Sequence, residues 1–184
     1  CDAYGWPHDT LDSEEDMLHG RYHPVMQCKL VGALDAGNNL TGLHMRLSGQ
    51  SILSVVRPEA LQQGKDPLVF QGLNPGGDFA IGYSVPNLLI DHAMRNTHVP
   101  PGFWRGVNIN QNAIFLECFM DELAEAAKQD PVAYRIALLE KTPRAKAVLA
   151  LAADKAGWGQ KLPPRVGRGV SVQNAFATYM AQVA

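Results

Sequence analysis

The chain has 184 residues, of which 46% are hydrophobic and 18% charged, a composition that fits a packed interior and a surface with few charges. The formal net charge of -2 and the lack of a Lys/Arg cluster interleaved with aromatic residues argue against binding to nucleic acid. No apolar run approaches the roughly 20 residues of a membrane span.

The cysteines argue against several kinds of site. Cys1, Cys28 and Cys118 form no CxxC pair, so we expect neither an iron–sulfur cluster nor a structural zinc site in this chain. Cys118 lies in a helical pattern and is expected to be a packed thiol rather than a nucleophile. Because the sequence starts at Cys1 and stops inside the apolar run 177–184, we expect a piece of a larger parent chain.

The first half of the chain is expected to form a sheet. Residues 1–20 are a polar lead-in segment, a solvated loop or short helix, to which we assign no chemistry. Strands are predicted over 25–34 and 40–48, joined by a turn, because apolar and polar residues alternate in the second of them. Residues 57–78 are rich in Pro and Gly and predict a long irregular loop, and another strand is predicted over 88–95.

Helices are expected in the second half. An apolar stripe predicts a helix over about 112–128, with Glu117 off that stripe. An Asp or Thr directly before Pro predicts the start of two further helices, near 131–140 and 143–156. Residues 168–184 predict a single strand. The expected fold class is therefore α+β, with a mixed sheet, a hairpin and packed helices.

The loop ahead of the first helix contains the run GFWRG, in which Arg105 lies just before the helix. A guanidinium beside the backbone N–H groups of a helix start can bind an anionic group. Taken alone, Arg105 would be an ordinary ion-pairing residue. Asn110 or Asn112 is expected to cap the helix. Trp104 either lines a pocket or fills the core.

Other candidate groups lack a recognisable arrangement. His19 and His23 have the helical spacing of a metal site, but the neighbouring Gly and Pro argue against a helix there. No GxGxxG, Walker A or GxSxG motif occurs, which disfavours a nucleotide site and a serine hydrolase.

The longer run GFWRGVNINQNAIFLECFMDELA, residues 102–124, resembles a signature of the molybdenum hydroxylase family, which includes xanthine dehydrogenase and aldehyde oxidase. The Gln six residues after Arg105, the Glu twelve residues after it and the final acidic-Glu-apolar-Ala run are in register without a gap. The similarity is to the isoquinoline 1-oxidoreductase and bacterial aldehyde dehydrogenase branch, and it covers about residues 14–184.

The resemblance implies roles for particular residues. Arg105, Gly106 and Gln111 would contact a molybdopterin cofactor, and Trp104 and Val107 would lie toward the substrate. No catalytic residue and no metal ligand of this chain is implied. Purine-oxidising members carry an aromatic residue where this chain has Val107, so a purine stacked at that wall is not expected.

The resemblance also implies a domain arrangement. Residues 21–160 would be part of a first molybdopterin-binding domain, and 161–184 would begin a second. A Gly-Gly-x-Phe-Gly loop and a Gly-Glu stretch of the family do not occur in this sequence. The chain on its own is therefore expected to be inactive.

Enzymes of this family hydroxylate an aldehyde or an N-heteroaromatic carbon with oxygen from water. The resemblance implies molybdenum held by molybdopterin, as such or as its cytosine dinucleotide. The implied partners are a small [2Fe-2S] subunit that carries the iron–sulfur clusters, a cytochrome c or flavin subunit, and a small-molecule substrate. The implied location is a complex at the bacterial inner membrane, with its periplasmic face favoured over the cytoplasmic one.

Two other classes of function stay open from the sequence. The hydrophobic composition also suits a non-catalytic interaction or assembly module that packs against a partner. A small hydrolase using His and Asp residues is the less favoured alternative, because the sequence has no nucleophile motif.

Overall fold

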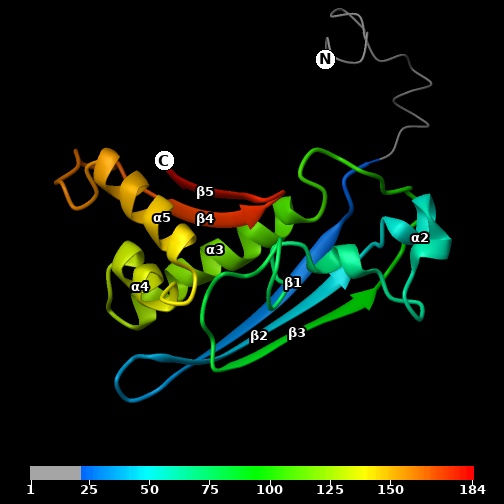
Figure 1. Ribbon diagram of the computed structural model, residues 1–184, viewed down its shortest axis with the longest axis horizontal. Coiled ribbons are helices and arrows are strands. Elements are labelled where there is room, and N and C mark those ends of the chain that lie inside the picture. The colour runs from blue at the N-terminus through cyan, green and yellow to red at the C-terminus, as the bar shows by residue number, and fades with distance from the viewer. Residues whose placement is uncertain (1–21) are drawn as a thin grey trace, which may run out of the picture.

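The computed structural model describes residues 22–184, which form a three-stranded sheet, helices over one face of it, and a separate two-stranded hairpin (Figure 1). Strand β1 (Met26–Leu34) pairs antiparallel with β2 (Leu40–Gly49), and β2 pairs parallel with β3 (Asn87–Met94). The mixed sheet, the first hairpin and the α+β class are therefore confirmed. Residues 1–20, including His19, lie outside the described part.

The turn between β1 and β2 is closed by a carboxylate. Asp35 Oδ1 accepts hydrogen bonds from the backbone N–H groups of Gly37 at 2.8 Å and Asn39 at 2.9 Å. Such an Asx turn fixes the register of the two strands. As a result, Leu43 and Met45 of β2 point into the core.

The connection from β2 to β3 is irregular, as predicted, but it contains three short helical segments. They are α2 (Leu53–Val56), η2 (Pro58–Ala60) and η3 (Pro67–Phe70). The buried Asp66 holds this connection together, because its Oδ2 accepts from Ser51 Oγ at 2.7 Å and from the Leu53 N–H at 3.0 Å.

Three longer helices follow β3: α3 (Ile109–Ala126), α4 (Pro131–Leu138) and α5 (Pro143–Lys155). Asp130 caps α4 as predicted, since its Oδ1 accepts from the N–H groups of Val132 and Ala133. The Thr142 hydroxyl does not cap α5; it donates to the Gly82 carbonyl at 3.0 Å. Within residues 22–184, no helix has the length and apolar character needed to cross a membrane.

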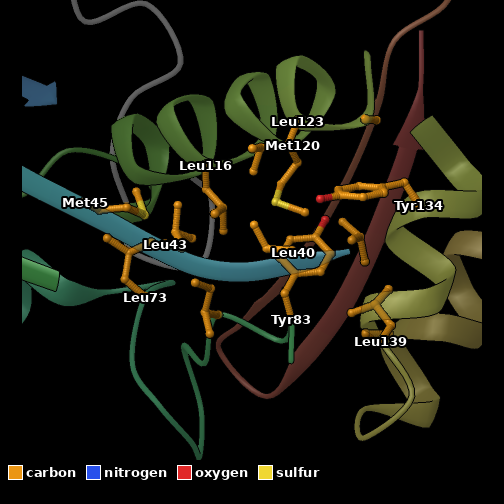
Figure 2. Packing of buried hydrophobic residues seen from close by; sticks show 14 of the residues in the cluster. Leu40, Leu43, Met45, Leu73, Tyr83, Leu116, Met120, Leu123, Tyr134 and Leu139 are labelled. Atoms are coloured by element: carbon orange, nitrogen blue, oxygen red, sulfur yellow. The ribbon is translucent and has the colours of Figure 1, made fainter. Parts of the chain in front are cut away.

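The core lies between α3 and the sheet (Figure 2). Leu116, Met120 and Leu123 of α3 pack against Leu43 and Met45 of β2, and all five are almost completely buried. Burying one such side chain stabilises the fold by about 1.5–3 kcal/mol relative to leaving it exposed. This stripe fixes which face of α3 meets the sheet.

Two predictions about α3 were wrong. Glu117 was expected off the buried stripe, yet it is only 5% exposed, because α4 and β4 (Val170–Ala175) cover that side of the helix. Cys118 was expected to be packed, yet it is exposed. One residue along a helix is a rotation of about 100°, so Cys118 turns away from the elements that bury Glu117.

The prediction of one strand over 168–184 was also wrong. The segment forms two antiparallel strands, β4 and β5 (Thr178–Val183), joined by a two-residue turn at Phe176 and Ala177. Both turn residues adopt positive φ, 51° and 56°, a conformation that usually requires Gly or Asn. A contact from another segment holds the turn: the Phe79 ring packs edge-on against the Phe176 ring, with 4.9 Å between the ring centres.

Candidate functional site

The residues that the motif singles out lie together in the loop before α3 and in its first turn, which we call the α3 entrance (residues 104–112). Gly106 has φ +85°, and a Cβ there would collide with the side chain of Asn110. Asn110 Nδ2 in turn donates to the Arg105 carbonyl at 2.5 Å. Val107 also adopts a positive φ, 51°, which is costly for a β-branched residue.

Helix α3 begins without a side-chain cap. Neither Asn110 nor Asn112 caps it, so that prediction was wrong. Asn112 instead donates to the carbonyls of Val69 at 2.7 Å and Gln71 at 2.8 Å. Among residues 22–184, no acceptor meets the backbone N–H groups of Asn110 or Gln111. These N–H groups carry the positive end of the helix dipole and are free to bind an acceptor.

Arg105 is exposed, and within the described residues its guanidinium makes no ion pair and no hydrogen bond. It therefore adds an unpaired positive charge to the loop that leads directly into the free N–H groups of α3. Trp104 is 60% exposed, which rules out the alternative that it fills the core of this chain. The loop thus presents a cation and an apolar ring on the same short segment.

A buried polar layer supports the entrance from below. Gln71 Oε1 accepts from the Asn108 backbone N–H at 3.1 Å, and Asn108 Oδ1 accepts from Gln111 Nε2 at 2.8 Å. Gln111 is 8% exposed, and its Oε1 is buried without a hydrogen-bond partner, as is Asn112 Oδ1. A buried amide oxygen without a donor costs free energy, so these atoms are sites where a ligand donor would be stabilised.

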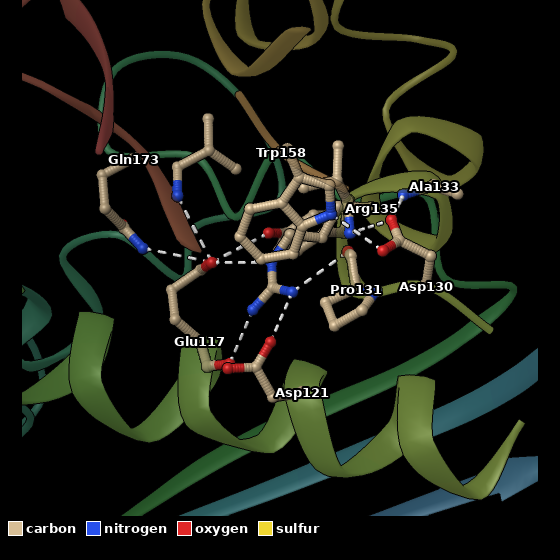
Figure 3. Close-up of polar contacts among 11 residues, drawn as sticks. Glu117, Asp121, Asp130, Pro131, Ala133, Arg135, Trp158 and Gln173 are labelled. Atoms are coloured by element: carbon tan, nitrogen blue, oxygen red, sulfur yellow. Dashed lines mark hydrogen bonds and ion pairs between the residues drawn. The ribbon is translucent and has the colours of Figure 1, made fainter. Parts of the chain in front are cut away.

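Further along α3, a buried ion pair fixes the helix against its neighbours (Figure 3). Glu117 Oε2 accepts from Arg135 Nε at 3.0 Å, and its carboxylate also accepts from the Tyr83 hydroxyl at 2.9 Å. Arg135 donates in addition to the Glu117 carbonyl at 2.8 Å and to Asp121 Oδ1 at 2.7 Å. Each of the three guanidinium nitrogens thus donates to at least one acceptor.

Burial raises the pKa of Glu117, while the neighbouring Arg135 charge and the donors around the carboxylate oppose that shift. Burial, and then the Glu117 charge, raise the pKa of the Tyr83 hydroxyl well above its usual value. Tyr83 therefore keeps its proton and acts as a donor. This network is a structural brace, since its charges are paired with one another.

All five predicted site residues, Arg105, Gly106, Gln111, Trp104 and Val107, fall in the α3 entrance. Sequence reasoning missed Gln71, which comes from the loop before β3 and meets Asn108 through the tertiary fold. A groove of about 1140 Å³ lies elsewhere, between residues 75–88, 139–145 and 172–179, and no residue of the α3 entrance lines it.

Known proteins resemble the chain both in sequence and in fold. Isoquinoline 1-oxidoreductase subunit beta of Brevundimonas diminuta is 24% identical over 169 residues, which cover 90% of this chain and 21% of that protein. A membrane-bound aldehyde dehydrogenase (pyrroloquinoline-quinone) of Gluconacetobacter polyoxogenes is 25% identical over 173 residues, 84% of this chain and 22% of that protein. No protein-family model matches.

Among solved structures, an aldehyde oxidoreductase from Desulfovibrio gigas shares the fold with a TM-score of 0.51 and 18% identity, over 82% of this chain and 18% of that one. The chain spans about a fifth of the length of the curated relatives that it matches. The sequence matches, the shared fold and the in-register motif at residues 102–124 together relate this chain to the molybdenum hydroxylase family.

Proposed function

We propose that this chain is part of the molybdopterin-binding subunit of an oxidoreductase that hydroxylates aldehydes or N-heteroaromatic compounds with water-derived oxygen. The observation that carries the proposal is the α3 entrance. There, an unpaired guanidinium, two free backbone N–H groups and a buried amide oxygen without a donor occur within residues 105–111. The names of the sequence relatives, an isoquinoline oxidoreductase subunit and an aldehyde dehydrogenase, support the substrate classes.

The residues present fit the polar groups of molybdopterin. Arg105 and the N–H groups of Asn110 and Gln111 would hold its anionic oxygens, because charge-assisted hydrogen bonds at a helix start favour anions. Gln111 Oε1 would accept from an N–H group of the pterin. Gly106 keeps the loop free of a side chain at this point.

When bound, the cofactor would supply the two-electron oxidation and the oxygen derived from water. The contribution of this chain is to bind and orient. Trp104 offers an exposed ring, and Val107 a small apolar group, on the side where a substrate would lie. Neither residue can exchange a proton at neutral pH, so their role would be to shape the pocket and exclude water.

The form of the cofactor is part of the proposal. We propose molybdopterin or its cytosine dinucleotide, together with molybdenum. The name of the Gluconacetobacter relative gives pyrroloquinoline quinone instead. A protein that held only that quinone would contain no molybdenum and no pterin, so analysis of the metal and of the released cofactor separates the two.

The names of the same relatives support a proposal for the partners and the location. The Brevundimonas relative is named as a beta subunit, which supports a multi-subunit enzyme. We propose a small [2Fe-2S] subunit that receives the electrons and a cytochrome c or flavin subunit beyond it. The Gluconacetobacter relative is named as membrane-bound, which supports association with a membrane. We propose a complex at the bacterial inner membrane, on its periplasmic face in preference to its cytoplasmic face.

The test is Arg105→Ala in the native protein, purified with its accompanying subunits. A charge-assisted hydrogen bond contributes about 1.5–3 kcal/mol, so we expect the affinity for the cofactor to fall roughly 10- to 100-fold. Molybdenum and pterin per subunit would fall with it, as would aldehyde or N-heterocycle oxidation. Arg144→Ala is the matched control, because Arg144 is an exposed arginine in α5.

If Arg105→Ala retains native molybdenum content and native oxidation rates, the assigned role of Arg105 is wrong. A native protein without molybdenum, pterin or quinone would instead favour the alternative of a non-catalytic assembly module. The α3 entrance would then be a contact surface for a protein partner.

A further inference from the structure

A second arginine lies beside the α3 entrance. The Arg57 guanidinium carbon is 5.8 Å from the centre of the Phe103 ring, over the face of that ring. Phe103 is 45% exposed, and Trp104 next to it is 60% exposed. Contiguous exposed apolar surface is a feature of ligand-binding and protein-contact sites.

Both sides of this contact are anchored to the fold. The Arg57 N–H donates to the Leu53 carbonyl at 2.9 Å and so ends α2, which the buried Asp66 holds in place. On the other side, the Val107 N–H donates to the Trp104 carbonyl at 2.8 Å. The backbones that carry Arg57 and the two rings are therefore fixed before a ligand arrives.

The Arg57 guanidinium has donors to spare. Among residues 22–184, it makes no ion pair and no side-chain hydrogen bond. The cation–π contact with Phe103 uses the charge of the guanidinium and none of its N–H donors, which stay available for a carboxylate. Trp104, which follows Phe103 in the sequence, offers a second exposed aromatic ring on the same loop. The loop thus combines exposed aromatic rings with a nearby cation, Arg57, that pairs with no carboxylate among residues 22–184.

We propose that Arg57, Phe103 and Trp104 form a recognition site for aromatic compounds that carry a carboxylate. The ring of the ligand packs on the exposed aromatic side chains, and its carboxylate accepts hydrogen bonds from Arg57. This inference rests on the proposed function, because it names the substrates of that enzyme as anionic aromatic aldehydes or carboxylated N-heteroaromatics. It involves no covalent step by this chain.

The test is calorimetric binding of benzoate and of benzamide, its neutral counterpart, to the native protein with its accompanying subunits. We expect the native protein to bind benzoate more tightly than benzamide. Arg57→Ala should lower the affinity for benzoate about tenfold and leave the affinity for benzamide unchanged. Arg57→Lys, which keeps the charge but not the planar fork, should lose part of the preference. Arg144→Ala, at an exposed arginine in α5, should leave both affinities at native values.

The same variants are then compared in the oxidation of 4-formylbenzoate and of 4-methylbenzaldehyde. We expect Arg57→Ala to lower kcat/KM about tenfold for the anionic aldehyde only, mainly through KM. If the ratio of the affinities for benzoate and benzamide is the same in native protein and in Arg57→Ala, the inference is overturned. The inference is also overturned if the native protein does not bind benzoate. That result is expected if a carboxylate of another protein segment pairs with Arg57.

These outcomes separate the inference from the proposed function. The native protein could contain molybdenum and oxidise the neutral aldehyde while Arg57→Ala changes the affinity for neither ligand. That result would overturn this inference and leave the proposed function standing. Benzoate binding that depends on Arg57 in a protein without molybdenum would support the recognition site and contradict the proposed enzyme.

Discussion

Glu117 carries a charge in the interior, and the surrounding donors decide whether the fold can tolerate it. They come from three other segments: Tyr83 before β3, Arg135 in α4, and the Val172 N–H in β4 at 3.3 Å. The helical pattern alone placed Glu117 off the buried face. Its partners are 18 to 55 residues away in sequence, so no local signal could identify them.

Glu117→Gln tests this brace. The change removes the negative charge and leaves Arg135 buried without its main partner, so we expect a loss of about 3 kcal/mol in the free energy of unfolding. Urea unfolding of the 184-residue chain measures it. Glu122→Gln is the control, because Glu122 is exposed on the same helix and should change stability by less than about 0.5 kcal/mol. Equal losses in the two variants would show that Glu117 is not a brace.

The residues of the candidate site were found from the motif rather than from the helical pattern. Arg105 and Gly106 belong to a recognisable loop, and Gln111 follows at fixed spacing. Gln71 was missed because it meets Asn108 only through the fold, at a separation of 37 residues. The cation–π contact of Arg57 with Phe103 was missed for the same reason.

At the scale of elements, the hydrophobic patterns predicted the first hairpin and α3, and an Asp or Thr before Pro predicted the starts of α4 and α5. The strand β3 was also predicted, and the ends of these elements differ from the structure by a few residues. The largest error was the hairpin β4–β5. Its turn contains neither Gly nor Asn, although both central residues have positive φ. Tertiary contacts hold this turn, including a hydrogen bond from the Ala177 N–H to Asp78 Oδ1 at 3.1 Å.

Ala177→Gly should therefore stabilise the protein. Gly adopts the left-handed conformation at this position without steric cost, and we expect a gain of about 0.5–1 kcal/mol in the free energy of unfolding. The control Ala150→Gly, at an exposed position within α5, should instead cost about 1 kcal/mol. A loss of stability in Ala177→Gly would mean that the positive φ at this turn stores no strain.

At the scale of the whole molecule, α3 connects the candidate site to the core. Its first turn forms the α3 entrance, its middle packs on β2, and Glu117 ties it to α4 and β4. In Figure 1 the helix lies across the sheet, with α4 and α5 beyond one of its ends. A rigid helix placed in this way presents its free N–H groups at a fixed position. A large ligand that is held by several hydrogen bonds requires such fixed donors.

The central claim is that the free N–H groups of Asn110 and Gln111 hold the molybdenum cofactor. Amide hydrogen exchange tests it directly, in native protein loaded with cofactor and in the same protein produced without it. We predict that peptides covering residues 105–115 exchange at least about tenfold more slowly in the loaded protein, while peptides from α4 are unchanged. Identical exchange of residues 105–115 in the two forms, with molybdenum present in the loaded one, would contradict the claim.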